Sequence, residues 1–125
     1  MPTILIVEDN ADLLSILKQL LSRKYRVFAA RRGEEGIELA REHRPELVIL
    51  DLGLPAMDGI ETGKWIKREL GDAVAILVLT ALAGKGDPEA VLDSGCCDAY
   101  MAKPAPLASI ENKVAELLEG RTKAA

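Results

Sequence analysis

One short stretch constrains the fold more than any other: the apolar run at residues 47–50, which leads directly into Asp51. No polar residue alternates within this run, which is typical of a strand buried on both faces in a parallel sheet. Gly53, Pro55 and Gly59 follow closely and cannot continue the strand. Asp51 is therefore expected where the strand leaves the core, at the carboxyl edge where open α/β sheets bind ligands.

Strand and helix signals alternate along the whole chain. Strands are predicted at residues 3–7, 26–30, 47–50, 74–79 and 99–102. Helices are predicted around residues 13–21, 33–42, 59–70, 88–95 and 107–120. Such strict alternation predicts a parallel sheet with right-handed crossovers and helices on both faces.

The polarity of the strands predicts their order in the sheet. The first, third and fourth strands are apolar throughout and belong inside, whereas the second and fifth are mixed or short and belong at the edges. This favours the order 2-1-3-4-5, a doubly wound, flavodoxin-like (βα)5 fold of the α/β class. Asp9 or Asn10 is expected to cap the first helix, and Asp87 with Pro88 to begin the fourth.

Length and composition narrow the class of protein. With 125 residues and no break in composition, we expect one domain over residues 1–120 and a flexible tail at 121–125. A formal net charge of −4 and one Trp, two Tyr and one Phe argue against direct nucleic-acid binding. No apolar run approaches the length of a membrane span, and residues 1–3 lead straight into a strand rather than a signal peptide. We expect a cytoplasmic protein without membrane contact.

The cysteines and the histidine favour no metal site of their own. Cys96 and Cys97 are adjacent, an arrangement that rarely forms a structural disulfide and offers no second pair for zinc. We interpret both as free thiols in a reducing cytosol. His43, the single histidine, lies at a polar helix end and is interpreted as solvated.

Four of the five predicted strands end in a functional group at the same edge of the sheet. These groups are Glu8 with Asp9, Asp51, Thr80 and Lys103. Three gathered carboxylates repel one another and raise each other's pKa unless something neutralises them. Lys103 supplies one positive charge, and a hard divalent cation such as Mg²⁺, which prefers oxygen ligands, suits the rest.

Such a site has the parts that phosphoryl transfer needs. Asp51 is the predicted nucleophile, because carboxylates can form an aspartyl-phosphate. Asp9, helped by Glu8, is predicted to position the cation. Thr80 would donate a hydrogen bond to the phosphoryl group, and Lys103 would bind another of its oxygens.

The sequence resembles response-regulator receiver domains of two-component signalling. Four segments carry the resemblance, in the family's order and over essentially the whole chain: residues 6–10 (IVEDN), 50–59 (LDLGLPAMDG), 79–83 (LTALA) and 98–104 (DAYMAKP). One acidic pair alone would be weak support, but the set together is highly specific. The stretch from Thr80 to Pro104 looks most like single-domain receivers and the receivers of hybrid kinases.

The resemblance implies a role for each matching residue. The roles are phosphoacceptor for Asp51, metal ligands for Glu8, Asp9, Asp51 and the Gly53 carbonyl, and phosphoryl binding for Thr80, the Ala81 N–H and Lys103. It also implies Mg²⁺ or Mn²⁺ as cofactor and a cis Lys103–Pro104 bond. The phosphoryl donor would be a phosphohistidine on a sensor histidine kinase or a histidine phosphotransfer protein. Such a receiver catalyses only its own phosphorylation and slow dephosphorylation.

A conformational switch is the second implication of the resemblance. In receivers the hydroxyl residue, here Thr80, is drawn to the phosphoryl group, and an aromatic residue, here Tyr100, then turns inward. The output face would comprise the fourth helix, the fifth strand and the fifth helix. The chain would act as a monomer or as a phosphorylation-dependent dimer.

Other interpretations compete with this one. A phosphatase of the haloacid-dehalogenase type also forms an aspartyl-phosphate, but it needs a second Asp where this chain has Gly53. A flavodoxin-like electron carrier would have a Ser/Thr- and Gly-rich loop in place of Glu8 and Asp9, and a degenerate receiver would lack a reacting group. In simpler interpretations Asp9 only caps a helix, and Tyr100 only packs on the edge strand. Asp58 is expected to form the turn before the third helix, and Trp65 is expected to be a packing residue.

Overall fold

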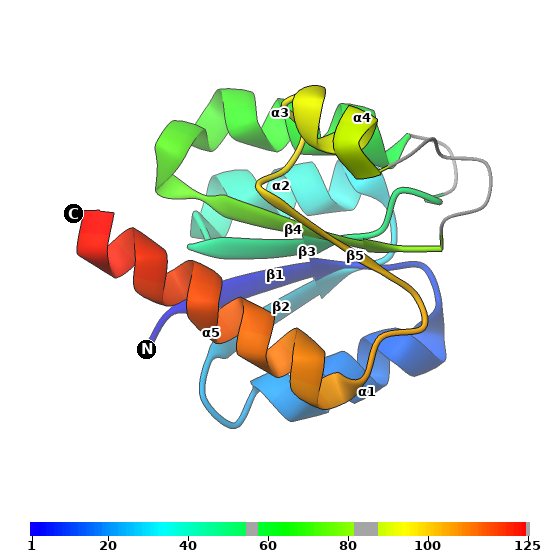
Figure 1. The fold of residues 1–125 in the computed structure, drawn as a ribbon, viewed down its shortest axis with the longest axis vertical. Helices are drawn as coiled ribbons and strands as arrows, with labels where there is room; N and C mark the ends of the chain where they lie inside the picture. The colour runs from blue at the N-terminus through cyan, green and yellow to red at the C-terminus, as the bar shows by residue number, and fades with distance from the viewer. Residues whose placement is uncertain (55–57, 82–87, 125) are drawn as a thin grey trace.

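The chain folds into a five-stranded sheet flanked by helices (Figure 1). The computed structural model describes residues 1–54, 58–81 and 88–124. The strands are β1 (Thr3–Val7), β2 (Arg26–Ala30), β3 (Leu47–Leu50), β4 (Ala75–Thr80) and β5 (Ala99–Ala102). The helices are α1 (Ala11–Leu21), α2 (Gly33–His43), α3 (Gly59–Leu70), the 3-10 turn η1 (Gly71–Ala73), α4 (Pro88–Asp93) and α5 (Leu107–Ala124).

All strand pairs are parallel, and their order is β2-β1-β3-β4-β5, as predicted from strand polarity. The three central strands are almost entirely buried, which explains why they lack alternating polar residues. Val7 on β1 lies opposite Ala30 on one side and Leu50 on the other. Strands β1, β2 and β3 therefore end in register, whereas β4 continues past Val78, the partner of Leu50, to Thr80. The residues at the ends of these strands meet at one edge.

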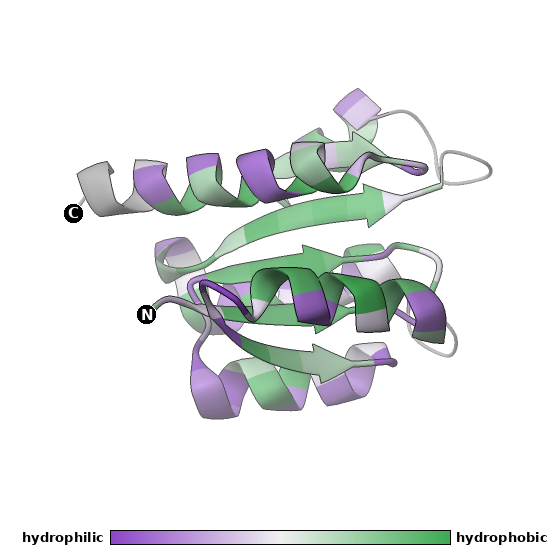
Figure 2. Ribbon diagram, turned by 90° about the horizontal axis from the view of Figure 1, so that it is seen from below, coloured by the Kyte–Doolittle hydropathy of each residue, from purple (hydrophilic) through white to green (hydrophobic). Residues whose placement is uncertain are grey.

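Two helical layers bury the two faces of the sheet. Helices α1 and α5 cover one face, and α2, α3 and α4 cover the other (Figure 1). In α1 and α5, which lie in front of the sheet in Figure 2, hydrophilic and hydrophobic residues alternate along the helix. In α5 the inward row is Ile110, Val114 and Leu118, which has the spacing of one helical face. No helix among the described residues is long and apolar enough to cross a bilayer.

The predicted boundaries lie within about two residues of the observed ones, except for the end of the last helix. Asn10 caps α1 by accepting a hydrogen bond from the Leu13 N–H at 2.9 Å. The sequence had left open whether Asp9 or Asn10 is this cap. The last helix was predicted to end at Gly120, but α5 continues to Ala124. Gly120 is exposed, and a glycine in an exposed helical position weakens a helix by only about 1 kcal/mol. Pro55 and Asp87, predicted in a turn and at a helix cap, lie outside the described residues.

The interpretation of His43 as a solvated residue was also wrong. Its ring stacks on the Phe28 ring at 3.7 Å between centroids and 13° between planes, and its side chain is 26% exposed. The stack joins the end of α2 to the edge strand β2.

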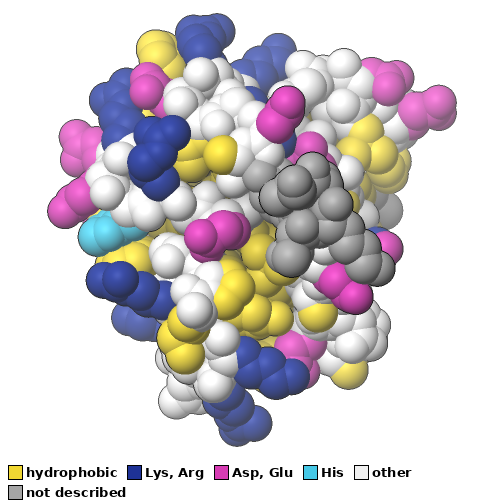
Figure 3. Space-filling view, turned by 90° about the vertical axis from the view of Figure 1, so that its left-hand side faces the viewer, with side chains coloured by type: hydrophobic (Ala, Val, Ile, Leu, Met, Phe, Trp, Pro, Cys, Tyr) yellow, Lys and Arg dark blue, Asp and Glu magenta, His cyan; other side chains and the backbone are white. Residues whose placement is uncertain are grey.

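Around the end of the molecule that carries both termini, basic and acidic side chains are intermixed (Figure 3). This face therefore carries charges of both signs.

We expect Gly63→Ala and Gly120→Ala to change stability in opposite directions. A Cβ at Gly63 would lie 2.4 Å from the backbone oxygen of Cys96, so α3 could not keep its position, and overpacking of this kind costs about 1–3 kcal/mol. A Cβ at Gly120 would meet nothing within 4 Å, so Gly120→Ala should stabilise α5 by about 0.5–1 kcal/mol. Urea unfolding of both variants measures these changes, and a neutral Gly63→Ala would contradict the close approach.

Candidate functional site

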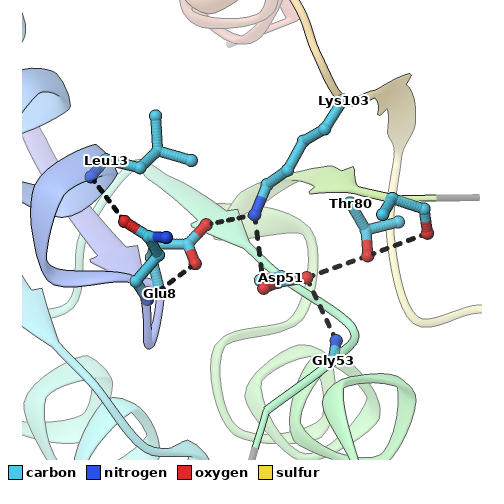
Figure 4. Close-up of polar contacts among 8 residues, drawn as sticks. Glu8, Leu13, Asp51, Gly53, Thr80 and Lys103 are labelled. Carbon is cyan, nitrogen blue, oxygen red and sulfur yellow. Dashed lines mark hydrogen bonds and ion pairs between the residues drawn. The ribbon is translucent and has the colours of Figure 1, made fainter.

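The candidate site lies at the carboxyl edge of the sheet, where four strands deliver functional groups (Figure 4). Backbone pairing continues to these residues: the Asp51 N–H donates to the Val7 carbonyl at 3.0 Å, and the Lys103 N–H donates to the Thr80 carbonyl at 2.9 Å. The sheet therefore fixes the starting point of each side chain. The predicted meeting of Glu8, Asp51, Thr80 and Lys103 is observed in the structure.

Asp51 is 7% exposed and accepts hydrogen bonds on both carboxylate oxygens. Oδ1 accepts from the Gly53 N–H at 3.0 Å and from the Thr80 hydroxyl at 2.8 Å, and Oδ2 lies 3.3 Å from Lys103 Nζ. Burial alone would raise the pKa of Asp51, but the Gly53 and Thr80 hydrogen bonds and the charge of Lys103 outweigh it and hold the pKa below its ordinary value. Asp51 is therefore an ionised, fixed carboxylate at neutral pH.

Lys103 links two buried carboxylates from distant parts of the chain. Its Nζ lies 2.7 Å from Glu8 Oε1 as well as 3.3 Å from Asp51 Oδ2. Burial would lower the pKa of Lys103, but the hydrogen bond and charge of Glu8 and the charge of Asp51 raise it above the ordinary value. Burial raises the pKa of Glu8, and the Lys103 and Asn10 hydrogen bonds offset this only in part. The Lys103–Pro104 bond that follows is cis, as the resemblance implied.

Three carboxylates could hold a cation. One ligand oxygen from each of Glu8, Asp9 and Asp51 lies within 4.8 Å of the others. Lys103 offsets only one of the three negative charges, and the donor atoms are all oxygen, the set that Mg²⁺ prefers. The charge and the chemistry of the cluster therefore fit a hard divalent cation. Gly53 is exposed beside this cluster, and a Cβ there would be 3.7 Å from Asp51 Oδ1.

Helix α3 supports the loop that follows Asp51. The Asp58 carboxylate caps this helix by accepting from the Ile60 N–H at 2.8 Å, which confirms its expected place at the turn. Gly59 lies against the backbone, since a Cβ there would be 2.4 Å from the Leu52 Cα and 2.5 Å from the Asp51 carbonyl oxygen. Only glycine allows this approach. The Asp-Gly pair at residues 58–59 thus sets how closely α3 packs behind Asp51.

Thr80 and Tyr100, the two predicted switch residues, lie on neighbouring strands. Thr80 is 2% exposed, and its hydroxyl is near the Ala81 carbonyl at 3.4 Å as well as bonded to Asp51. Tyr100 on β5 pairs with Val78, two residues before Thr80 on β4. The Tyr100 hydroxyl is buried and lacks a hydrogen-bond partner within the described part of the chain. Burial raises the pKa of this hydroxyl, with a smaller contribution from Cys97.

Sequence reasoning missed one residue at the rim of the site. Arg31 follows β2, and its Nη2 donates to the Asp9 backbone carbonyl at 2.9 Å. The Arg31 N–H in turn donates to Glu35 Oε1 on α2 at 2.9 Å. The rule that located the other residues also applies here, since Arg31 is the first residue after a strand. A surface arginine after an edge strand gives no further signal, because the length of its side chain decides what it reaches.

Comparisons with known proteins agree on the kind of domain. A family model described as the response regulator receiver domain matches residues 4–115. The chain is 39% identical over 105 residues to the polar-differentiation response regulator DivK of Brucella anthropi, which covers 82% of this chain and 84% of that protein. The DivK of Brucella ovis is 38% identical to this chain over 105 residues, again 82% of this chain and 84% of that protein.

Solved structures share the fold. The CheY-like receiver domain protein of Methanospirillum hungatei JF-1 superposes with a TM-score of 0.92 at 26% identity, covering 100% of this chain and 99% of that one. The second structure is the receiver domain of the sensor histidine kinase PA1611 from Pseudomonas aeruginosa PAO1, which has magnesium coordinated in its active-site cleft. It superposes with a TM-score of 0.82 at 30% identity, covering 94% of this chain and 98% of that one.

Metal titration tests the carboxylate cluster directly. We expect Asp9→Asn to weaken Mn²⁺ binding by at least about tenfold, because it removes one charged ligand and about 1.4 kcal/mol is enough for that factor. Asp58→Asn is the matched control: it also removes a carboxylate near the site, but asparagine still caps α3. Calorimetry or Mn²⁺ electron paramagnetic resonance measures both. Equal affinities of the two variants would contradict a metal site at Asp9.

Proposed function

Because this chain belongs to the response regulator receiver domain family, we propose that it is a phosphoacceptor of two-component signalling in which Asp51 receives the phosphoryl group. The observation that carries the proposal is the set of contacts on Asp51. Its carboxylate is ionised, nearly buried and flanked by a hydroxyl and an ammonium group. These are the groups that a phosphoryl-accepting carboxylate needs around it.

The transfer is a displacement at phosphorus. A carboxylate oxygen of Asp51 attacks, a P–O bond forms, and the P–N bond of the phosphohistidine donor breaks, leaving its imidazole as the departing group. The low pKa of Asp51 keeps the nucleophile deprotonated. The Thr80 hydroxyl, now bonded to Asp51 Oδ1, and the Lys103 ammonium group then exchange to oxygens of the phosphoryl group. The N–H of Ala81 would donate to a further oxygen.

Glu8, Asp9, Asp51 and the Gly53 carbonyl would hold Mg²⁺ or Mn²⁺. When bound, the cation offsets negative charge on the phosphoryl oxygens. The close approach of the three carboxylates supports this assignment, as does the magnesium in the cleft of the PA1611 receiver domain. Glu8 is engaged by Lys103 and by the Asn10 N–H, which favours a role for Glu8 through water rather than by direct ligation.

The donor would be a phosphohistidine on a sensor histidine kinase or a histidine phosphotransfer protein, in the cytoplasm, and the chain would take part in a phosphorelay. It acts as a signalling phosphoacceptor and not as an enzyme that turns over a substrate. Gly53 supports this choice, because the position where a phosphatase would carry its acid has no side chain. The output would involve neither direct nucleic-acid binding nor a membrane, and a monomer or a phosphorylation-dependent dimer would deliver it.

Acetyl phosphate with Mg²⁺ tests the assignment of Asp51. We expect intact mass spectrometry to detect one added phosphoryl group on the wild-type chain and none on Asp51→Asn. Asp58→Asn, which leaves the cluster unchanged, should be phosphorylated like wild type. Chelation of Mg²⁺ should abolish the reaction. An adduct that persists in Asp51→Asn would refute Asp51 as the acceptor.

The switch would join Thr80 to Tyr100. When Thr80 moves toward the phosphoryl group, space opens beside β4, and Tyr100 takes an inward position that changes the face formed by α4, β5 and α5. The buried, unpartnered hydroxyl of Tyr100 among the described residues supports a residue with more than one available position.

Nuclear magnetic resonance of the Tyr100 ring tests the switch. We expect its signals to shift when beryllofluoride, a phosphoryl mimic, saturates the site with Mg²⁺. The Tyr25 ring, which packs on the opposite helical layer, provides the internal control and should shift less. Unchanged Tyr100 signals at saturation would remove Tyr100 from the switch.

A further inference from the structure

The Cys96–Cys97 pair is a pair of thiol side chains that lies outside the acidic cluster at Asp51. Both cysteines are free, and both are buried in the apolar cluster beneath α2, α3 and α4. They lie in the loop that connects α4 to β5. The two thiols are consecutive in the chain, lie in the same cluster and interact with one another, so we treat them as one site.

The two thiols differ in acidity. Hydrogen bonding from Cys97 lowers the pKa of Cys96 to about 6 against the opposing effect of burial, and Ser94 contributes in the same direction. The same interaction raises the pKa of Cys97, as does burial. The pKa of Cys96 therefore lies below that of Cys97, which makes Cys96 the more readily ionised of the two thiols. Thiolate character is what makes a cysteine a nucleophile and a metal ligand.

The loop is held firmly on the side of α3. A Cβ at Gly63 would lie 2.4 Å from the Cys96 carbonyl oxygen, so helix and loop are in contact. Asp98, the next residue after the pair, accepts from the Ile76 N–H at 2.7 Å and pairs with Lys67 of α3 at 2.7 Å. This side of the loop cannot open without breaking the edge of the sheet.

On the other side the covering element among residues 1–54, 58–81 and 88–124 is α4, and that cover is slight. Of the six residues of α4 only Val91 is buried. The Val91 carbonyl accepts from the Cys96 thiol at 3.6 Å and from the Ser94 hydroxyl at 2.6 Å. A short displacement of α4 would remove Val91 from Cys96 and expose the pair. Local opening of such thinly packed elements occurs well below the free energy of global unfolding.

We propose that Cys96 and Cys97 form a dithiol site, closed by α4, that captures a soft thiophilic species such as a trivalent arsenical as one bidentate ligand. Two sulfur donors fit this class. Within the described residues the only group of three or more carboxylate, thiol or imidazole ligands is the acidic cluster at Asp51, so the pair lacks the further ligands of a tetrahedral zinc site.

The reaction balances without an oxidant. With phenylarsine oxide, two arsenic–sulfur bonds form and the arsenic–oxygen bond breaks. The two thiol hydrogens leave with that oxygen as water, and arsenic stays trivalent. Because the bound species would occupy the space beneath α4, it would keep Val91 and the rest of α4 displaced from their present position. Tyr100, three residues after Cys97 and packed on the same cluster, would then report the change.

Phenylarsine oxide added to the folded chain, without Mg²⁺ or a phosphoryl donor, tests the site. We expect intact mass spectrometry to find one arsenical per chain. The adduct should resist excess glutathione, a monothiol, and be removed by a dithiol. Cys96→Ala and Cys97→Ala should each lose this resistance, with circular dichroism confirming that both variants fold. Resistance that survives in either variant, or a wild-type chain that reacts only in urea, would overturn the site.

Two further variants separate this proposal from the phosphoacceptor assignment and test the cover. Asp51→Asn should bind the arsenical like wild type, since Asp51 takes no part in the dithiol chemistry. Val91→Ala should react roughly tenfold faster, because the single buried side chain of α4 is shortened. An unchanged rate in Val91→Ala would overturn the cover by α4. Phosphorylation of the wild-type chain by acetyl phosphate is scored separately and has no bearing on either outcome.

Discussion

Three carboxylates and one ammonium group meet at the carboxyl edge of the sheet. Their charges do not cancel, and this excess of negative charge determines what the site can bind. Lys103 contacts Glu8 and Asp51 but leaves the cluster with excess negative charge. The surroundings shift the pKa values of the two buried carboxylates in opposite directions. Three donors hold the pKa of Asp51 low, whereas burial raises the pKa of Glu8. Two neighbouring carboxylates with opposite tendencies can take different parts in one reaction.

Helix α3 connects the two chemical centres of the molecule. Gly59 and Gly63 lie four residues apart and so occupy the same side of this helix. The first packs against the backbone at Asp51 and Leu52, and the second packs against the backbone of Cys96. One helix therefore sets the position of the loop after β3 and of the loop before β5. A shift of α3 along its axis would move both loops together.

The sequence predicted the fold and the membership of the site well, because both follow from strand polarity and connectivity. Unbroken apolar runs placed β1, β3 and β4 inside the sheet, and parallel strands bring whatever follows them to one edge. The direct hydrogen bond between Thr80 and Asp51 was beyond prediction, because it depends on side-chain rotation within the cluster. Arg31 was missed since its reach to Asp9 depends on a flexible side chain. The true end of α5 was missed because a glycine at an exposed position costs a helix only about 1 kcal/mol, which is too little to end it at Gly120.

Glu8 and Lys103 are 95 residues apart in the chain, yet their side chains are in direct contact. Closing so large a separation is the slow part of forming a sheet of this kind, since the loop entropy must be met before the contact is gained. A nascent chain still on the ribosome presents Asp51 long before Lys103 has emerged from the exit tunnel. Because Lys103 is synthesised 52 residues after Asp51, the cluster of charged side chains at this edge of the sheet is assembled only late in the synthesis of the domain.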